Sequence, residues 1–359
     1  MRLLFCTQAL DLDHPVLGFA HEWVLRLAQR VENVIVVPVA VGRVRLPSNV
    51  DVRPLHRELG GHGFAKLLAF RRIVGGACAR REVDAVFAHM VPRYAAFAAP
   101  FARPRRIPIF LWYTHKGVDW SLRLAEPCIA RAYTASASSF RLRSAKKVVT
   151  GHGIDTAWFT PPADDARPEH DIAVVGRIAP VKDPLTLVEA LGVLAGRGLR
   201  PKVVLAGDTL LASHDAYRAR VLARIDALGL RSQVTALGNV PHERVRDVFH
   251  SATCFVTPSL TGSVDKTVLE AMSCGRIALT CNESFHDVFG ALAPRLMFGV
   301  GAVDGLATLL ETHLTAPPEQ RAALGRALRD LVVREHDLER LMDRLVADMG
   351  SVLAARGHG

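Results

Sequence analysis

The feature that most constrains the fold of this chain is a repeated alternation of strand-like and helix-like segments. Short apolar runs alternate with longer stretches of helical periodicity, which is the pattern of parallel α/β units. In the first half, the runs predict strands at 2–7, 33–39, 84–89, 107–114 and 147–150, with helices at 18–30, 64–81, 93–101 and 120–133.

The alternation breaks once, in a polar segment rich in proline, and then starts again. Residues 161–168 read Pro-Pro-Ala-Asp-Asp-Ala-Arg-Pro, which fits neither periodicity, so a linker is predicted over 161–170. The second half predicts strands at 171–176, 202–206, 234–238, 254–257 and 277–280, helices at 184–197, 215–230, 243–251 and 267–273, and a late helix at 338–354.

We therefore predict two domains of the α/β class, each built on a doubly wound parallel sheet. A chain of 359 residues exceeds the size at which one core usually divides. The first domain is expected over 1–160 and the second over 171–337, and the C-terminal helix at about 338–359 is expected to pack back on the first. Ligands of such sheets bind at the carboxyl ends of the strands, which predicts a central cleft between the domains.

Composition excludes several classes of protein. Half of the residues are hydrophobic and 22% are charged, which excludes a largely disordered chain. No apolar run reaches membrane-spanning length, and the first residues do not resemble a signal peptide. The six cysteines are scattered without a CxxC pair, which favours reduced thiols in a cytoplasmic protein over disulfides or zinc.

Positive charge is concentrated in the first half of the chain. Residues 1–160 hold 23 Lys and Arg against 11 Asp and Glu, whereas the remainder holds 22 against 24. An arginine-rich proteome would explain this excess, and so would an anionic partner such as a membrane surface or an acidic acceptor. Because the basic residues lack interleaved exposed aromatics, nucleic acid is not an expected partner. Peripheral membrane contact is kept as a hypothesis.

Two loops of the second half have the chemistry to bind a diphosphate. The segment from Gly176 to Lys182 ends a predicted strand and places two cations before a helix, where they can neutralise a departing diphosphate. Residues 257–266 are small and polar, and they lead into a helix on which Glu270 could reach ribose hydroxyls. Solvated surface cations, a plain N-cap at Asp265 and an ordinary exposed glutamate would also explain these residues.

Other nucleotide and catalytic signatures are absent from the sequence. It contains no GxGxxG after a strand, no GxxxxGKS or GxxxxGKT loop, no GxSxG and no HExxH. The spacing of Asp11 and Asp13 could hold a metal, but two carboxylates in a loop are more often solvated. We therefore predict no metal site and no cofactor.

Together the motifs resemble the retaining GT-B glycosyltransferases of family 4. Gly176-Arg177 with Lys182 is similar to the G-R-x(4)-K loop of that family, and Leu-Glu-Ala-Met-Ser-Cys-Gly at 269–275 is similar to its L-E-A-M-A-x-G helix. Val-Thr-Gly-His-Gly-Ile-Asp at 149–155 resembles the N-G-V-D segment that ends the first domain. The order and spacing of the three elements make coincidence improbable.

The resemblance implies a GT-B fold, in which two Rossmann-like domains face a central cleft, and transfer of a sugar from a nucleoside-diphosphate sugar with retention. Arg177 and Lys182 would stabilise the leaving diphosphate, and Glu270 would hold the ribose. His115, just past a strand end, would face the donor sugar, although capping or packing would also explain it. Further donor contacts are implied at Gly18, Gly176, Gly238, Asn239, Gly262, Ser263, Val264, Asp265 and Lys266.

Two positions depart from the family pattern. Leu17 replaces the first glycine of the GG loop, and Gly262 stands where the family usually has a glutamate that touches sugar hydroxyls. We expect Asp265 or the amides around Ser263 to take over that contact. The alternatives are a sugar-nucleotide epimerase or hydrolase on the same fold, and a non-catalytic protein that binds nucleotide or glycan. The acceptor is left open, with an anionic or lipid-linked molecule as one option.

Overall fold

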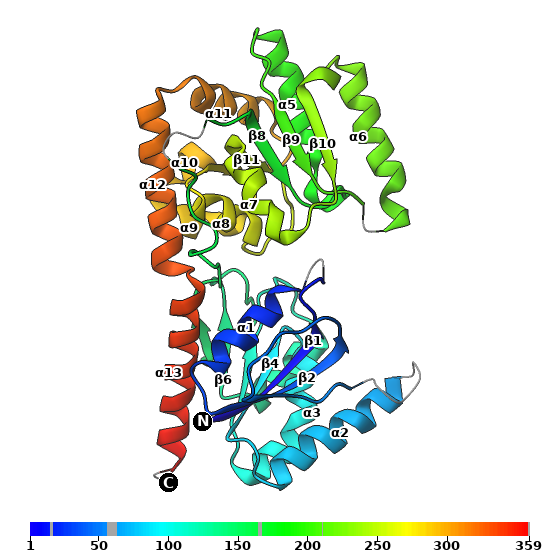
Figure 1. Ribbon diagram of the computed structural model, residues 1–359, viewed down its shortest axis with the longest axis vertical. Coiled ribbons are helices and arrows are strands. Elements are labelled where there is room, and N and C mark those ends of the chain that lie inside the picture. The colour runs from blue at the N-terminus through cyan, green and yellow to red at the C-terminus, as the bar shows by residue number, and fades with distance from the viewer. Residues whose placement is uncertain (15–16, 56–62, 164–166, 210, 358–359) are drawn as a thin grey trace. The chain divides into compact units, whose positions relative to one another are not determined.

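Each half of the chain builds its own parallel sheet (Figure 1). The computed structural model describes residues 1–359 except 15–16, 56–62, 164–166, 210 and 358–359. It divides into a first unit, Met1–Gly151 with Glu339–Gly359, and a second unit, His152–Leu338. The predicted first boundary lies at 160, with a predicted linker over 161–170, of which 164–166 lie outside the described residues. The division falls earlier because Ile154 bridges to Asp337 of the second unit.

The first unit contains a seven-stranded sheet in the order β3-β2-β1-β4-β5-β6-β7, with every pairing parallel. The central strands β1, β4 and β5 are apolar and almost wholly buried, as expected for a sheet covered on both faces. The strands are β1 (Arg2–Leu10), β2 (Asn33–Val41), β3 (Val50–Val52), β4 (Ala85–His89), β5 (Ile109–Trp112), β6 (Arg131–Thr134) and β7 (Lys147–Val149), and the helices between them are α1 (Phe19–Ala28), α2 (Gly63–Ala79), α3 (Pro92–Ala102) and α4 (Trp120–Ala125).

The second unit contains a five-stranded parallel sheet in the order β10-β9-β8-β11-β12. Its strands are β8 (His170–Val175), β9 (Val203–Ala206), β10 (Val234–Gly238), β11 (Ala252–Thr257) and β12 (Ile277–Thr280). Its helices are α5 (Pro184–Gly196), α6 (Asp215–Ala227), α7 (His242–His250), α8 (Lys266–Ser273), α9 (His286–Phe289), α10 (Ala293–Leu296), α11 (Val303–Thr315) and α12 (Pro318–Glu335).

Both sheets are doubly wound, which confirms the predicted fold class. The first strand of each unit has later strands on both sides, since β1 lies between β2 and β4, and β8 lies between β9 and β11. At such a reversal of strand order, the loops at the carboxyl ends of the two central strands diverge and leave room for a ligand. The loops that follow β8 and β11 are therefore the first place to look for a site in the second unit.

The clearest differences from the sequence prediction concern two strands and the end of one helix. The helix expected over 120–133 ends at Ala125, because Glu126-Pro127 turns the chain into a short 3-10 helix. Ala132 and Tyr133, which were assigned to that helix, are instead buried in β6. The short edge strand β3 was missed because it is only three residues long.

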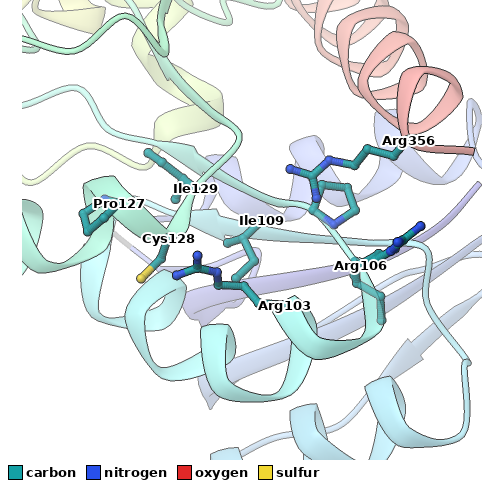
Figure 2. A pocket seen from close by; sticks show the side chains of 9 residues that line it. Arg103, Arg106, Ile109, Pro127, Cys128, Ile129 and Arg356 are labelled. Atoms are coloured by element: carbon teal, nitrogen blue, oxygen red, sulfur yellow. The ribbon is translucent and has the colours of Figure 1, made fainter. Parts of the chain in front are cut away.

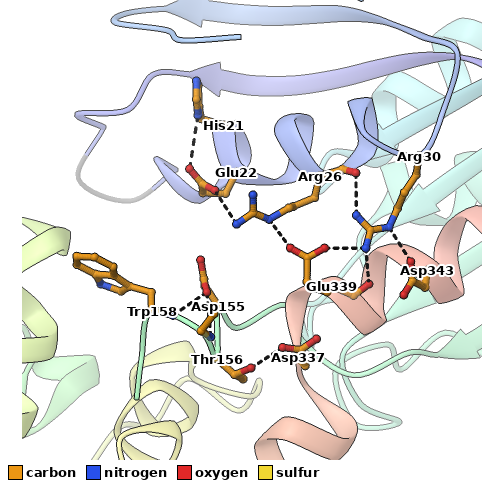
Figure 3. A network of polar contacts seen from close by, with 11 residues as sticks. His21, Glu22, Arg26, Arg30, Asp155, Thr156, Trp158, Asp337, Glu339 and Asp343 are labelled. Atoms are coloured by element: carbon orange, nitrogen blue, oxygen red, sulfur yellow. Dashed lines mark hydrogen bonds and ion pairs between the residues drawn. The ribbon is translucent and has the colours of Figure 1, made fainter. Parts of the chain in front are cut away.

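The C-terminal helix α13 (Leu338–Gly357) belongs to the first unit from Glu339 onward. It contacts the N-terminal part of that unit through charged and polar groups. Glu339 accepts from both Arg26 and Arg30, each at 2.6 Å, and Arg30 also contacts Asp343 (Figure 3). Further along, the Tyr133 hydroxyl donates to Asp348 at 2.7 Å. None of the helices in the described ranges combines the length and apolarity needed to span a bilayer.

Within the second unit, one arginine of α12 joins its first residues to the end of α8. The Arg329 guanidinium donates to the backbone carbonyls of Phe159 and Ser273, and also to that of Thr156 at 3.3 Å. The Ser273 carbonyl lies at the C-terminus of α8, where the last backbone carbonyls of a helix have no hydrogen-bond donor within the helix. Arg329 therefore fixes the position of α8, which carries Glu270.

We predict that Arg329→Ala lowers the free energy of unfolding of the second unit by about 2–4 kcal/mol, because it leaves several carbonyls without their charged donor. Urea unfolding followed by Trp158 fluorescence measures this, since Trp158 is the only tryptophan in the second unit. Arg326→Ala, an exposed arginine of the same helix, is the matched control and should change little. Equal losses in both variants would contradict the assignment.

Candidate active site

The two candidate diphosphate loops meet at the carboxyl ends of β8 and β11. The Leu260 amide donates to the Val181 carbonyl at 2.8 Å, which joins the loops through their backbones. The Lys182 ammonium donates to the Ser259 hydroxyl at 3.2 Å and to the Asp265 carboxylate at 3.0 Å. Residues 83 positions apart in the sequence thus form an ion pair at the point where the strand order reverses.

The Lys182–Asp265 pair is largely sheltered from solvent, with 18% and 12% of the two side chains exposed. One Asp265 oxygen, Oδ1, also accepts from Thr261 at 3.3 Å. The other, Oδ2, is buried and has no hydrogen-bond partner among the described residues. Asp265 makes no side-chain capping bond to α8, so the plain N-cap alternative does not describe it. A buried carboxylate oxygen without a donor costs free energy, which a ligand hydroxyl would recover.

The other cation of the first loop, Arg177, is exposed. Gly176, Arg177, Lys182 and Thr257 help to line a cavity of about 20 Å³, which is room for little more than a water molecule. Helix α5 begins directly after these cations, as the sequence predicts. Asp183 is the residue that precedes the helix, with φ of 43°, and its carboxylate accepts a hydrogen bond from the Thr186 hydroxyl.

Three glycines end neighbouring strands at this edge of the sheet. Gly176, Gly207 and Gly238 lie at or directly after the ends of β8, β9 and β10, and the Gly207 amide donates to the Gly238 carbonyl at 2.7 Å. A Cβ on Gly207, whose φ is +140°, would lie 2.0 Å from the Gly176 carbonyl oxygen. Sequence reasoning missed Gly207, although a Gly-Asp pair directly after a predicted strand was a signal for it. Asn239, also predicted, is exposed.

Glu270 is buried on α8 rather than exposed on a helix surface. Only 4% of its side chain is accessible, and its Oε1 lies 3.3 Å from Nε2 of His242 at the start of α7. The His242 ring also contacts the edge of Phe159. Burial lowers the pKa of Lys266, and the nearby carboxylates of Glu270 and Asp155 raise it in part. His242 was not predicted, because nothing in the motif of α8 indicates a partner on another helix.

The loop that departs from the family pattern has a backbone reason for its glycine. Gly262 has φ of +63°, a left-handed conformation that strains any residue with a Cβ. Next to it, the Asn282 amide donates to the Ser263 carbonyl at 2.7 Å, and Val264 is buried. Asn282 follows β12 and was not predicted. A glutamate at position 262 would be strained in this backbone conformation.

In the first unit, His115 follows β5 and is exposed. Its Nδ1 accepts from the Gly117 amide at 2.9 Å, so the neutral ring carries its proton on Nε2. Gly18 precedes α1, where a Cβ would lie 3.1 Å from the His14 carbonyl oxygen. The structure places these two predicted residues in the first unit and the remaining predicted site residues in the second.

The acidic pair Asp11 and Asp13 makes contacts within its own loop and with Arg43. The Asp13 carboxylate pairs with Arg43 at 2.6 Å, and Asp11 accepts from the backbone amides of Asp13 and Arg43. Across the described ranges, no group of three His, Cys, Asp or Glu side chains could hold a metal ion. A metal-independent reaction remains a prediction.

Residues 163–330 match the model of the family described as glycosyl transferases group 1. The chain is 28% identical to a 2-deoxystreptamine N-acetyl-D-glucosaminyltransferase of Streptomyces fradiae over 56% of this chain and 54% of that protein. It is 27% identical to the lipopolysaccharide core biosynthesis mannosyltransferase LpcC of Rhizobium leguminosarum over 69% of this chain and 71% of that protein. The chain thus spans about half the length of the first relative.

Among solved structures, Anabaena Alr3699/HepE in complex with UDP is similar, with a TM-score of 0.79 and 17% identity over 98% of this chain and 100% of that one. At 17% identity this likeness shows the fold, two Rossmann-like domains with parallel sheets, and residues 163–330 are similar to the group 1 glycosyl transferases. The matched residues 163–330 include both loops, Glu270 and the three glycines.

We predict that Gly207→Ala disrupts this edge of the sheet, because its Cβ would collide with the Gly176 carbonyl and its φ would be strained. The expected loss is about 1–3 kcal/mol of stability, together with weaker donor binding. Gly196→Ala is the control, since no atom lies within 4 Å of a Cβ there. Calorimetry of both variants measures the difference, and an unchanged Gly207→Ala protein would refute the close approach.

Proposed function

We propose that this chain is a retaining glycosyltransferase of family 4 that transfers a sugar from a nucleoside-diphosphate sugar to a glycan, lipid or small-molecule acceptor. The observation that carries the proposal is the meeting of Lys182 and Asp265 on the two loops that flank the strand reversal. Those loops lie in the part of the chain that matches the group 1 family. The relatives include sugar transferases, and the similar solved structure contains UDP.

Stabilisation of the leaving diphosphate is the proposed source of most of the rate. The transition state has oxocarbenium character, so negative charge develops on the departing diphosphate. Lys182 is partly buried and already ordered by Ser259 and Asp265, so little reorganisation is needed when that charge appears. Arg177 is exposed beside it and supplies a second cation. We propose that this charge replaces a metal ion.

The remaining donor contacts are proposed from the groups around this pair. Glu270, buried beside His242, would accept from the ribose hydroxyls. Ser263 and its neighbours would hold phosphate or sugar, and Gly18 would approach the donor closely. His115 would present its Nε2 proton to the sugar. No protein nucleophile is assigned.

Asp265 is the proposed replacement for the glutamate that Gly262 lacks. Its Oδ2 is buried without a partner among the described residues, and its Oδ1 is held by Lys182. A sugar hydroxyl that donates to Oδ2 would satisfy this acceptor. The donor sugar would then be selected at a hydroxyl that reaches this oxygen.

The proposed location is the cytoplasm, with peripheral contact to an anionic membrane surface. All six cysteines are free and five are buried, which fits a reducing compartment. The first unit holds 26 Lys and Arg against 13 Asp and Glu. That excess supports contact with anionic head groups or with an anionic or lipid-linked acceptor.

We predict that Lys182→Ala lowers kcat about a hundredfold or more, with a smaller effect on donor affinity, because the contact strengthens as charge develops. Steady-state kinetics with the preferred donor measures both. Lys202→Ala removes an exposed lysine just before β9 and should behave like wild type. Near-normal turnover of Lys182→Ala would contradict the proposal that Lys182 stabilises the leaving diphosphate. In a separate test, loss of activity in EDTA would refute metal independence.

We predict that Asp265→Asn changes donor preference, because it removes a charged acceptor while keeping the size of the side chain. Losing one such contact should lower kcat/KM for the preferred donor about five- to hundredfold, and less for a donor that lacks the hydroxyl. A donor panel measures the profile, with the exposed Asp330→Asn as control. An unchanged donor profile would show that Asp265 does not contribute to selection of the donor sugar. If the wild type turns over no donor with any acceptor, the non-catalytic alternative is favoured.

A further inference from the structure

A cavity of about 440 Å³ opens at the amino-terminal edge of the sheet in the first unit (Figure 2). Its floor is formed by the residues that lead into β5 and β6, and its rim by the ends of α3 and α13. His115 follows the opposite end of β5. The cavity therefore lies at the other edge of the sheet from the residue predicted to face a sugar.

Three arginines and no acidic residue line this cavity. Arg103 and Arg106 come from the end of α3 and the 3-10 turn that follows, and Arg356 comes from the last turn of α13. More than two hundred positions of sequence separate Arg103 from Arg356, so the fold and not a local basic run brings them together. Figure 2 shows the Arg103 and Arg356 side chains reaching over the cavity from its two sides.

This cavity differs from places in the first unit where an arginine lies beside a carboxylate. Several arginines of the unit are paired in this way, as in Arg2–Asp84, Arg43–Asp13, Arg53–Glu82 and Arg131–Asp348. Arg103 and Arg356 have no ion-pair or side-chain hydrogen-bond partner in the part of the chain that the structure describes. Like charges that converge without a carboxylate repel one another, and an anion between them would relieve that repulsion.

The floor of the cavity is apolar. Ile107, Ile109 and Ile129 are buried beneath it, and Pro127 and Cys128 form one side. The volume falls in the range of small-molecule sites, which combine an apolar surface with a few charged groups. The lining suits a ligand that has one strongly anionic group and an uncharged body.

We propose that this cavity binds a phosphoryl group, with Arg103 and Arg356 as the main donors and Arg106 as a third. Guanidinium groups match phosphate oxygens with paired N–H bonds, which favours phosphate over a carboxylate of lower charge. Two sources carry the required chemistry, a soluble phosphomonoester and the phosphate of a lipid head group. The site is separate from the proposed donor loops, which belong to the second unit, and does not depend on the proposed function.

Cys128 provides a local reporter for this site. It lines the cavity and is the one cysteine of the six that is not buried. A small thiol reagent should therefore modify Cys128 first, and Cys128→Ser should abolish the fast reaction. A ligand seated between the arginines and the apolar floor would cover the sulfur, which makes the rate of modification a measure of occupancy.

The experiment compares the rate of Cys128 modification with and without ligand in the intact protein. Mass action slows the reaction by 1 + [L]/Kd, so a ligand at about ten times its Kd gives about tenfold protection. Inorganic phosphate and glycerol 3-phosphate probe the soluble source, and phosphatidic acid vesicles, with phosphatidylcholine vesicles as blank, probe the lipid source. Protection in the first arm identifies a soluble ligand, and protection by phosphatidic acid alone identifies a lipid head group.

The variant Arg103→Ala/Arg356→Ala should lose the protection while keeping its unliganded melting temperature. Arg71→Ala/Arg72→Ala removes the same charge from exposed positions of α2 that do not line the cavity, and should keep it. No protection in either arm, or protection that survives Arg103→Ala/Arg356→Ala, would overturn the proposal. Because the readout needs neither donor nor turnover, its failure would leave the proposed transferase function untouched.

Discussion

The second unit is organised around the contact between Lys182 and Asp265. This pair joins the loop after β8 to the loop after β11 at the reversal of strand order, where a doubly wound sheet binds its ligands. Lys182 is mostly sheltered, and an ammonium in such a place needs a counter-charge. Asp265 supplies it. The cation proposed to meet the diphosphate is thereby held in position before any donor arrives.

The backbone around that contact is held by further interactions. Gly262 adopts a left-handed conformation that turns the loop, and Asn282 holds the loop from β12 through the Ser263 carbonyl. Glu270 has its own partner in His242, so both buried acids of the site have a basic partner in the absence of ligand. A donor that binds here exchanges protein contacts for ligand contacts. Such an exchange favours specificity, because a ligand lacking one of the matching groups leaves a buried partner unsatisfied.

Much of the fold was predictable from the sequence, because apolar runs and breaks in periodicity are local signals. β1, β8 and β12 are apolar runs, and each lies where the alternation placed it. Strand β6 was hidden because Arg131–Thr134 continues a stretch of helical appearance, and only Pro127 marks the change. The residues of the candidate site likewise fall into those that a local pattern predicts and those that it does not. Motifs identified Lys182 and Glu270, whereas Gly207, His242 and Asn282 act through partners distant in sequence, which no local pattern encodes.

The arginine-lined cavity shows why net charge predicts less than the placement of charge. The excess of Lys and Arg in the first half is visible in the sequence, and it predicts only an anionic partner, without saying where that partner binds. Several of the arginines that produce it are paired with carboxylates, as Arg26 and Arg30 are with Glu339 (Figure 3). The return of α13 to the sheet brings Arg356 to the cavity that Arg103 also lines. A paired surface arginine contributes little to recognition, since its charge is screened by its partner and by salt. The proposed recognition of an anion by the first unit therefore depends on Arg103 and Arg356, which the fold brings to one cavity.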